Sequence, residues 1–258
     1  MLNLSNKLGL NNSKNPQSAA GFENLYSLDF DGVDDYVTIP NNAAYTPTAV
    51  SGWSISYWCK VPSANKKLIG KYQNPNYEWY LQSAKTTGYQ SIQFHSGNNQ
   101  GLWQKLAANI DIADDNWHHV INTFDSSNQP SSIISYIDGI KYSAALGNAT
   151  WTSSGTWTGV TNTAAPLDFG AFSQTSFTDC NLDEVSIFDS VLSDATALAM
   201  YNSGTPTDLT GETNLQGWWR NGDTAGTSVY PTIEDYSSNS NDGTMTNMDS
   251  GDIVTVVP

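Results

Sequence analysis

The segment WSISYWCKV, residues 53–61, decides the fold class. Its odd-numbered positions are all apolar, whereas its even-numbered positions carry two serines, a tryptophan and a lysine. Side chains alternate between the two faces of a β-strand, so this period of two predicts a strand with one buried face. We expect the odd positions from Trp53 to Val61 to lie together in a core, and Pro62 to end the strand.

Short segments of the same kind follow along the chain. Alternation begins near Tyr26 and resumes after the turn at Asp31-Gly32. Further strands are expected at residues 67–72, 78–82, 91–95, 102–107, 117–124, 133–138, 140–143, 167–172, 182–188, 215–219 and 253–257. One helix is expected, with Ser193 as its cap and Asn202-Ser203-Gly204 at its end. Many short strands separated by Gly, Asn and Pro predict an all-β sandwich or jelly roll with one short helix.

The charge balance argues against two classes of partner. The 258 residues include 10 Lys and Arg against 25 Asp and Glu, for a formal net charge of −15, and the single arginine is Arg220. Binding to nucleic acid or to an anionic membrane surface needs clustered basic residues, so neither is expected. No apolar run approaches the roughly 18 residues of a membrane span, and the first residues do not have the pattern of a signal peptide.

The cysteines and glutamates limit the chemistry. Cys59 and Cys180 lie outside any metal-binding spacing, and they are either two buried free thiols or one disulfide. A glycoside hydrolase needs two carboxylates about 5–10 Å apart, but the five glutamates are widely scattered. The adjacent Asp183 and Glu184 would point to opposite faces of a strand. We therefore expect the protein not to be an enzyme.

Four segments resemble one known family. They are SLDFDGVDDYV (27–37), WSISYW (53–58), NWHHV (116–120) with YIDG (136–139), and LDEVSIF (182–188) with LS (192–193). In this order they resemble the strands of laminin-G-like, concanavalin A-like jelly rolls. The resemblance covers residues 26–204 and implies a concanavalin A-like β-sandwich.

The resemblance also implies a metal site. Relatives of this fold often hold a structural calcium ion, with a carbonyl from an early Asp-Gly turn and an aspartate from the closing strand. These positions correspond to Gly32 and Asp183, with Asp31 or Asp34 as further ligands. Calcium binds six to eight oxygen ligands of this kind. The alternative is that Asp-Gly serves only as a turn, with solvated acids.

The last segment of the chain stands in an unusual place. LQGWWR (215–220) and DYSSNSNDGT (235–244) resemble a segment that usually precedes such a domain, but here it follows one. It either folds back to supply edge strands or mediates assembly with another chain. We therefore divide the chain into an N-terminal arm (1–24), a jelly roll (25–204) and a C-terminal extension (205–258).

The arrangement of arm, domain and extension resembles virion proteins of tailed phages of marine bacteria. It implies a structural protein of a capsid or tail, assembled in the host cytoplasm, displayed on the virion surface and contacting other virion proteins or copies of itself in a homo-oligomer.

The alternative function is a carbohydrate-binding module for glycans. Its ligand-binding residues would be exposed tryptophans, since flat aromatic rings stack on sugar rings; the candidates are Trp79, Trp103, Trp151 and Trp157. The same residues could instead anchor a loop or a subunit contact.

Overall fold

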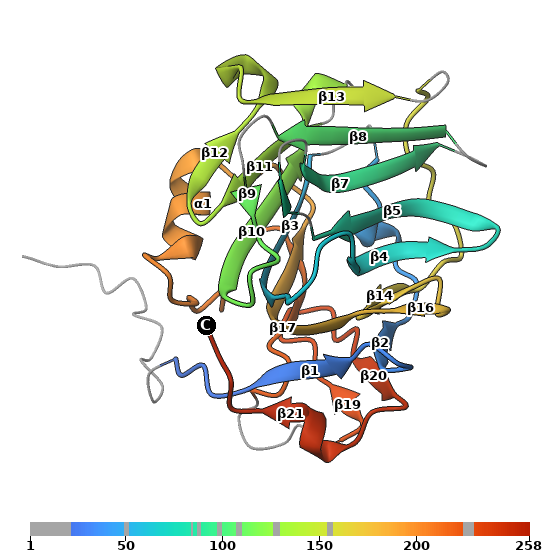
Figure 1. Ribbon diagram of the computed structural model, residues 1–258, viewed down its shortest axis with the longest axis vertical. Helices are drawn as coiled ribbons and strands as arrows, with labels where there is room; N and C mark the ends of the chain where they lie inside the picture. Colours follow the sequence, from blue (N-terminus) through green and yellow to red (C-terminus); the bar gives the residue numbers. More distant parts are fainter. Residues whose placement is uncertain are drawn as a thin grey trace, which may run out of the picture.

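The computed structural model describes residues 22–48, 52–83, 85–86, 89–96, 100–106, 110–125, 130–153, 157–223 and 230–258. Two antiparallel sheets lie face to face and enclose one large apolar core (Figure 1). The predicted all-β sandwich is therefore confirmed. Within the described residues no helix is long and apolar enough to cross a membrane.

The first sheet has the strand order β12-β11-β10-β3-β17-β1-β21, and β18 also pairs with β17. Its strands are β1 (Ser27–Asp31), β3 (Trp53–Lys60), β10 (Trp117–Phe124), β11 (Ile134–Ile137), β12 (Ile140–Tyr142), β17 (Asp179–Phe188), β18 (Leu215–Trp219) and β21 (Ile253–Val254). β17 is long enough to pair with β1 along its first half and with β18 along its second half.

The second sheet has the strand order β13-β8-β7-β5-β4-β14-β2-β20-β19. Its strands are β2 (Tyr36–Ile39), β4 (Lys67–Gln73), β5 (Asn76–Gln82), β7 (Tyr89–Ser96), β8 (Gln100–Leu106), β13 (Ala149–Ser153), β14 (Leu167–Phe169), β19 (Thr232–Ile233) and β20 (Gly243–Thr246). Two small antiparallel pairs stand apart from both sheets: β6 (Lys85–Thr86) with β9 (Ile110–Asp111), and β15 (Ala171–Phe172) with β16 (Ser176–Phe177).

The predicted helix is present as α1 (Asp194–Tyr201). The Ser193 side chain accepts a hydrogen bond from the Thr196 amide, and Asn202 ends the helix in a left-handed conformation. Single 3-10 turns occur at η1 (Ala43–Tyr45), η2 (Pro130–Ser132), η3 (Ala144–Leu146) and η4 (Ser250–Asp252).

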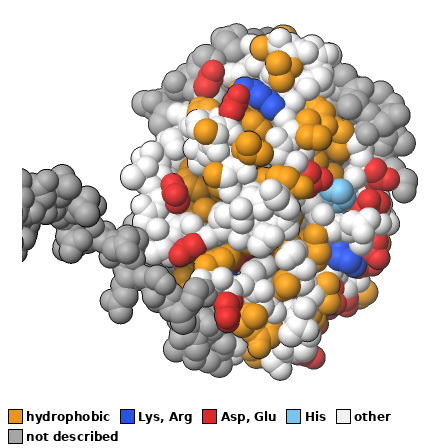
Figure 2. All heavy atoms as spheres, turned by 90° about the vertical axis from the view of Figure 1, so that its left-hand side faces the viewer, with side chains coloured by type: hydrophobic (Ala, Val, Ile, Leu, Met, Phe, Trp, Pro, Cys, Tyr) orange, Lys and Arg blue, Asp and Glu red, His pale blue; other side chains and the backbone are white. Residues whose placement is uncertain are grey.

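Both faces of β3 are buried, although the sequence predicted only one. The odd positions from Trp53 to Val61 are at most 2% exposed, as expected, but Ser54, Ser56 and Trp58 are also buried. A second apolar cluster covers the outer face of the first sheet; it contains Ile121, Tyr136, Phe188, Leu192, Ala197, Met200, Leu209, Leu215 and Trp218. The helix α1 contributes to this layer (Figure 1). On the side of the molecule shown in Figure 2, exposed apolar, acidic and basic side chains are interspersed rather than gathered in one patch.

Residues 205–258 contribute strands to both sheets. β18 pairs with β17, β20 lies between β2 and β19, and β21 pairs with β1. The Ser27 hydroxyl also donates to the carbonyl of Val256 (2.6 Å). The prediction of an N-terminal arm falls mainly on residues 1–21, which lie outside the described residues.

Residues 22–25 are held by a cluster around Arg220. Its guanidinium carbon lies 4.4 Å, 5.5 Å and 5.6 Å from the ring centroids of Phe22, Trp218 and Tyr236. We call Arg220 and these three rings the arginine cage. Arg220 Nη2 donates to the Glu23 carbonyl (2.6 Å), and Arg220 Nε donates to Glu184 Oε1 (3.0 Å). The single arginine therefore fastens the start of the described chain to β17 and β18.

The two cysteines are free thiols. Cys59 and Cys180 are both buried and unbonded. Burial raises the pKa of both thiols far above the usual range, so they behave as small apolar core side chains. Of the two alternatives that the sequence left open, the structure has the free thiols.

Candidate functional site

A row of outward-facing residues crosses the second sheet. In the strand register, Asp168 lies beside Gly70, Gly70 beside Tyr80, and Tyr80 beside Gln93. The residues that flank Asp168 and Tyr80 in sequence belong to the core, so the row itself points away from the core. A Cβ atom at Gly70 would lie 3.0 Å from the Cβ of Tyr80, so the missing side chain lets Tyr80 approach the strand closely.

Aromatic rings gather around this row. We call Tyr72, Tyr77, Tyr80, His95 and Phe172 the aromatic platform. The ring of Tyr72 lies 4.4 Å from that of Phe172 and 4.6 Å from that of Tyr77, centroid to centroid. The rings of Tyr80 and His95 lie at 5.5 Å and 4.8 Å from Tyr72. Tyr80 and His95 are 9% and 7% exposed, whereas the other three rings are half-buried and reach solvent.

Hydrogen bonds fix the buried members of the platform. The Tyr80 hydroxyl donates to Gln93 Oε1 (2.5 Å), and Gln93 Nε2 lies 3.1 Å from His95 Nε2. Burial lowers the pKa of His95 to about 4, so its imidazole is neutral near pH 7 and its Nε2 can accept from the amide. The Lys67 ammonium stands 5.6 Å and 5.8 Å from the ring centroids of Tyr80 and Phe172. The platform is therefore an aromatic surface whose buried members are held by hydrogen bonds and whose border carries polar groups.

The hairpin β15–β16 brings Phe172 to the platform and covers Asp168. Ser173 and Gln174 at its tip both have positive φ angles, 56° and 54°, a conformation that costs energy for residues other than glycine. Gln174 Nε2 donates to Asp168 Oδ1 (3.2 Å), while Gln174 Oε1 accepts from Gln73 Nε2 (3.2 Å). These bonds place the hairpin directly over the carboxyl group.

Asp168 is a buried carboxyl group with one unsatisfied oxygen. Its side chain is 1% exposed, and no donor among the described residues makes a hydrogen bond to Oδ2. Burial raises the pKa of Asp168 to about 6, and the nearby Thr38 hydroxyl and the Gln174 amide only partly oppose that rise. A carboxylate in this position is destabilised in the free protein.

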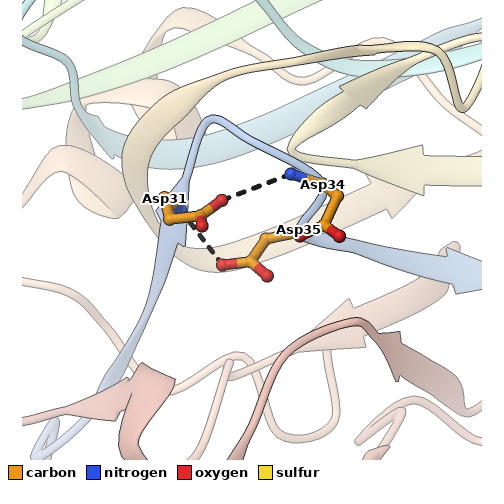
Figure 3. A group of neighbouring side chains, drawn as sticks. All are labelled: Asp31, Asp34 and Asp35. Carbon is orange, nitrogen blue, oxygen red and sulfur yellow. Dashed lines mark hydrogen bonds between the residues drawn. The ribbon is translucent and has the colours of Figure 1, made fainter.

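The predicted calcium turn contains three neighbouring carboxylates. One carboxylate oxygen from each of Asp31, Asp34 and Asp35 can be chosen so that the three atoms lie within 4.8 Å of one another. Figure 3 shows the three side chains at the turn. Asp31 Oδ1 accepts from the Val33 amide (2.7 Å), and Asp35 Oδ2 accepts from the Asp31 amide (3.1 Å). These bonds are typical of turn chemistry, yet each carboxylate keeps further lone pairs, so the donor set suits a hard cation.

Asp183 does not lie at this turn, so the predicted four ligands cannot share one ion. Asp31 pairs with Asp179 across β1 and β17, and Asp183 lies four residues further along β17, about 13 Å away at the usual strand rise. Gly32, at φ 73°, instead contacts Asp179: a Cβ at Gly32 would lie 2.6 Å from the Asp179 amide nitrogen. Asp183 is fully buried and accepts from Asn24 Nδ2 (2.9 Å).

The predicted tryptophans are not brought together. Trp79 is a fully buried core residue whose Nε1 donates to the carbonyl of Tyr45 (2.8 Å), so its predicted role as a ligand-binding residue is wrong. Trp157 is half-buried against Phe94 and Phe124. Trp151 is 44% exposed on the edge strand β13, separate from the platform. Trp103 stands beside Gln93 in the strand register, and its side chain lies outside the described part of the chain.

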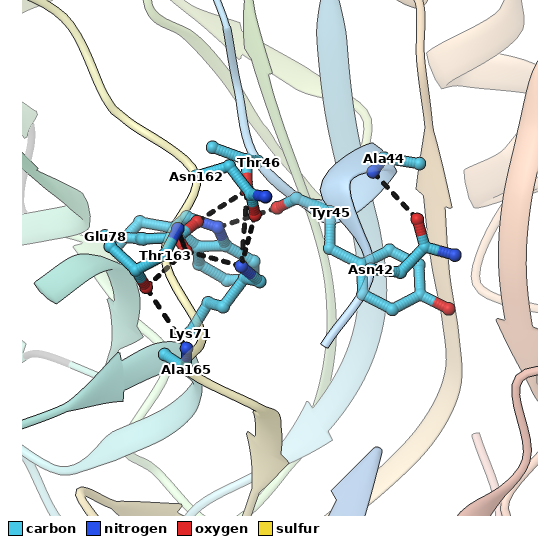
Figure 4. Close-up of polar contacts among 10 residues, drawn as sticks. Asn42, Ala44, Tyr45, Thr46, Lys71, Glu78, Asn162, Thr163 and Ala165 are labelled. Atoms are coloured by element: carbon cyan, nitrogen blue, oxygen red, sulfur yellow. Dashed lines mark hydrogen bonds and ion pairs between the residues drawn. The ribbon is translucent and has the colours of Figure 1, made fainter. Parts of the chain in front are cut away.

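A buried ion pair supports the platform from inside the sandwich. The Lys71 ammonium donates to Glu78 Oε1, and both side chains are 0% exposed (Figure 4). Glu78 also accepts from the amide and the hydroxyl of Thr163, both at 2.7 Å, and from the Thr46 hydroxyl at 2.6 Å. Lys71 donates to Asn162 Oδ1 (3.0 Å). The pair joins β4 and β5, which carry three of the platform rings, to two loops.

A comparison with known protein families assigns the chain to a class of protein. A family model described as Concanavalin A-like lectin/glucanases superfamily matches residues 31–197, and the chain belongs to that family. No curated protein matches the chain in sequence. The laminin-G-like, concanavalin A-like fold that the sequence predicted is thereby confirmed.

The chain is also similar to several solved structures at low sequence identity. A protein from Bacteroides ovatus, described as a candidate carbohydrate binding protein, is 14% identical with a TM-score of 0.59; the match covers 91% of this chain and 61% of that protein. Domain 4 of an extracellular arabinanase from Geobacillus stearothermophilus, solved with arabinotriose, is 18% identical with a TM-score of 0.42 over 64% of this chain and 71% of that one. A heptameric pentraxin from Limulus polyphemus is 11% identical with a TM-score of 0.45, covering 69% of this chain and 82% of that one.

Proposed function

We propose that this protein is a carbohydrate-binding domain without enzymatic activity and that its aromatic platform binds glycan. The observation that carries the proposal is the contiguous set of half-buried rings of Tyr72, Tyr77 and Phe172 on the outer face of the second sheet. Apolar faces of sugar rings stack on such side chains, and polar groups at the border orient the hydroxyl groups. The description of the Bacteroides relative is consistent with this function.

The carboxylates around the platform do not favour hydrolysis. As far as the structure describes the platform and its border, Asp168 is the carboxyl group there, and it is covered by Gln174. A glycoside hydrolase needs a second carboxyl group across the scissile bond. The adjacent pair Asp183 and Glu184 is buried in the first sheet, away from the platform.

Replacing Tyr72 with alanine tests the proposal. Tyr72 contacts the four other platform rings, so Tyr72→Ala should weaken glycan binding by about tenfold or more, as for a central binding residue. Binding is measured by depletion on beads that carry neutral polysaccharides, namely galactomannan, β-1,3-glucan and arabinan.

The matched control is Trp151→Ala, which removes an exposed aromatic ring outside the platform. This variant should bind like the wild type. Both variants must keep the far-ultraviolet circular dichroism of the wild type. If Trp151→Ala lost glycan binding and Tyr72→Ala kept it, the platform would not be the glycan-binding site. The site would then include the predicted residue Trp151.

The virion role and the virion-surface location stay predictions. The relatives named above are a carbohydrate-related protein, an enzyme domain and a pentraxin, and none is a virion protein. A glycan-binding domain displayed on a particle would combine both functions. Detection of the chain in purified phage particles, with self-association of the isolated protein, would support the virion role.

We also propose that the turn Asp31–Asp35 binds a structural calcium ion through Asp31, Gly32, Asp34 and Asp35. At a calcium concentration about 100 times the dissociation constant, binding should stabilise the protein by about 2.7 kcal/mol and raise the melting temperature by about 5 °C or more. Chelation with EDTA should reverse the rise, and Asp34→Asn should abolish it. An equal melting temperature of the wild type with calcium and with EDTA would leave the turn without a metal.

A further inference from the structure

The free protein holds a carboxylate that its own side chains do not satisfy. Asp168 Oδ2 is buried and receives no hydrogen bond from the described residues, while Oδ1 receives one from Gln174. Buried acceptors are nearly always paired, because an unmet acceptor costs free energy. Such a group is an expected place for a ligand donor.

This carboxyl group lies next to the platform. Asp168 and Tyr80 flank Gly70 on neighbouring strands, and Gly70 has no side chain to separate them. Phe172, two residues before Gln174 on the same hairpin, stacks on Tyr72 and meets the Tyr80 ring edge-on at 5.2 Å. A ligand on these rings therefore reaches the hairpin that covers Asp168.

We propose that Asp168, with Gln174 and Gln73 at its rim, forms a subsite that binds hydroxyl groups of a neutral glycan and disfavours anionic glycans. This inference rests on the proposed function of the platform. A carboxylate accepts hydrogen bonds from two neighbouring sugar hydroxyls, so a bound sugar supplies Oδ2 with the donor that it lacks. Gln174 donates to Oδ1 from the hairpin tip and covers the carboxyl group, so its side chain must move aside for a sugar hydroxyl to reach the buried Oδ2.

Charge favours neutral sugars. A uronate or sialate carboxylate would approach Asp168 in a protein of net charge −15. The lysine at the platform, Lys67, faces the rings of Tyr80 and Phe172, and burial lowers its pKa. It is therefore poorly placed to compensate an anionic ligand.

Binding should follow the ionisation of Asp168. The titratable groups that share the outer face of the neighbouring strands are Lys67 and Tyr72 on β4, Tyr77 and Tyr80 on β5, His95 on β7, and Tyr36 on β2, whose ring lies 6.1 Å from that of Phe177; the hairpin tip, residues 173–175, carries none. Burial raises the pKa of Tyr80 to about 12 and lowers the pKa of His95 to about 4, so neither group titrates between pH 5 and 7.5. The pKa of Asp168, about 6, falls inside that interval, so the carboxylate form is lost as the pH falls to 5.

The test compares the wild type, Asp168→Asn and a matched variant, Asp29→Asn. Asp29 is also a strand aspartate with a raised pKa, but it lies on β1 of the other sheet, where it accepts from Asn181. The probes are beads carrying galactomannan, β-1,3-glucan, arabinan or polygalacturonate, at pH 7.5 and pH 5. A salt concentration of 0.5 M reduces the effect of overall charge to a range of about 4 Å.

We expect the wild type to bind at least one neutral polymer at pH 7.5 and to bind it about tenfold more weakly at pH 5, the size of one lost charge-assisted hydrogen bond. Asp168→Asn should bind at the weaker level at both pH values, and Asp29→Asn should follow the wild type. Asp168→Asn should also raise the melting temperature at pH 7.5 without ligand, because it removes a buried charge.

Three results would overturn the subsite. They are wild-type affinity in Asp168→Asn, equal wild-type affinity at both pH values, and equal binding of polygalacturonate and the neutral polymers in 0.5 M salt. Failure of the wild type to bind any polymer would instead overturn the proposed function, and the subsite with it.

Discussion

Replacing Lys71 with methionine is expected to lower the free energy of unfolding by about 3–5 kcal/mol, the usual cost of removing one partner of a buried ion pair. The carboxylate of Glu78, which is 0% exposed, would then have lost its counter-charge, and Thr46 and Thr163 would be its donors among the described residues. Burial already lowers the pKa of Lys71, and the carboxylate of Glu78 opposes that effect. Urea denaturation at pH 7 measures the change.

The control is the double variant Lys71→Met with Glu78→Leu. Apolar residues of similar volume often replace a buried pair with little loss, so the double variant should recover a large part of the stability. A loss below about 1 kcal/mol in the single variant would mean that water enters and solvates Glu78.

Replacing Arg220 with methionine is also expected to lower the free energy of unfolding strongly, and the size of this loss should depend on pH. Burial raises the pKa of Asp183 and of Glu184, and the guanidinium of Arg220 limits the rise at Glu184. Without Arg220 the pKa of Glu184 rises further. A carboxyl group with a folded-state pKa above its unfolded value binds more protons when folded, so stability falls as the pH rises toward the folded-state pKa.

Arg220→Met should therefore cost about 3–5 kcal/mol at pH 8 and clearly less at pH 5, where Glu184 is protonated in the folded protein. Thermal unfolding between pH 5 and 8 measures how the stability loss caused by Arg220→Met changes with pH. Adding Glu184→Gln should remove most of this pH dependence, because the side chain at position 184 then no longer titrates. A loss of equal size at both pH values would show that the arginine cage acts through its ring contacts alone.

The sequence predicted correctly those strands and helices that have a strong local pattern, such as alternating apolar residues or a capping serine. β10 and β18 have the predicted bounds, and α1 begins after the predicted cap Ser193. The predicted strand at 167–172 is instead two strands, because Gly170 turns the chain at φ 76° and a Cβ there would lie 2.3 Å from the Phe30 ring. That turn creates the hairpin over Asp168.

The platform could not be predicted from alternation. The pairing of β4 and β5 shifts register between Lys71 and Tyr72, so ring positions beyond this bulge no longer follow a period of two. The sequence predicted ligand-binding tryptophans, yet Trp79 is a core residue, and the half-buried rings nearby belong to Tyr72, Tyr77 and Phe172. The sequence feature that could have indicated the platform is the recurrence of tyrosine, every three to five residues from Tyr72 to Tyr80.

The pairing of β1 with β21 and of β2 with β20 has a consequence for synthesis of the protein. β1 lies between β17 and β21, and β2 lies between β14 and β20, so both early strands keep an open edge until residues 243–254 are made. At about 5–20 residues per second, a ribosome needs on the order of tens of seconds to travel from β1 to β21. Throughout that time the apolar faces of the early strands have no complete partner. Recovery of soluble protein from cells should therefore depend on the release of the finished chain and on the holding activity of chaperones, more than on the stability of the sandwich once it has closed.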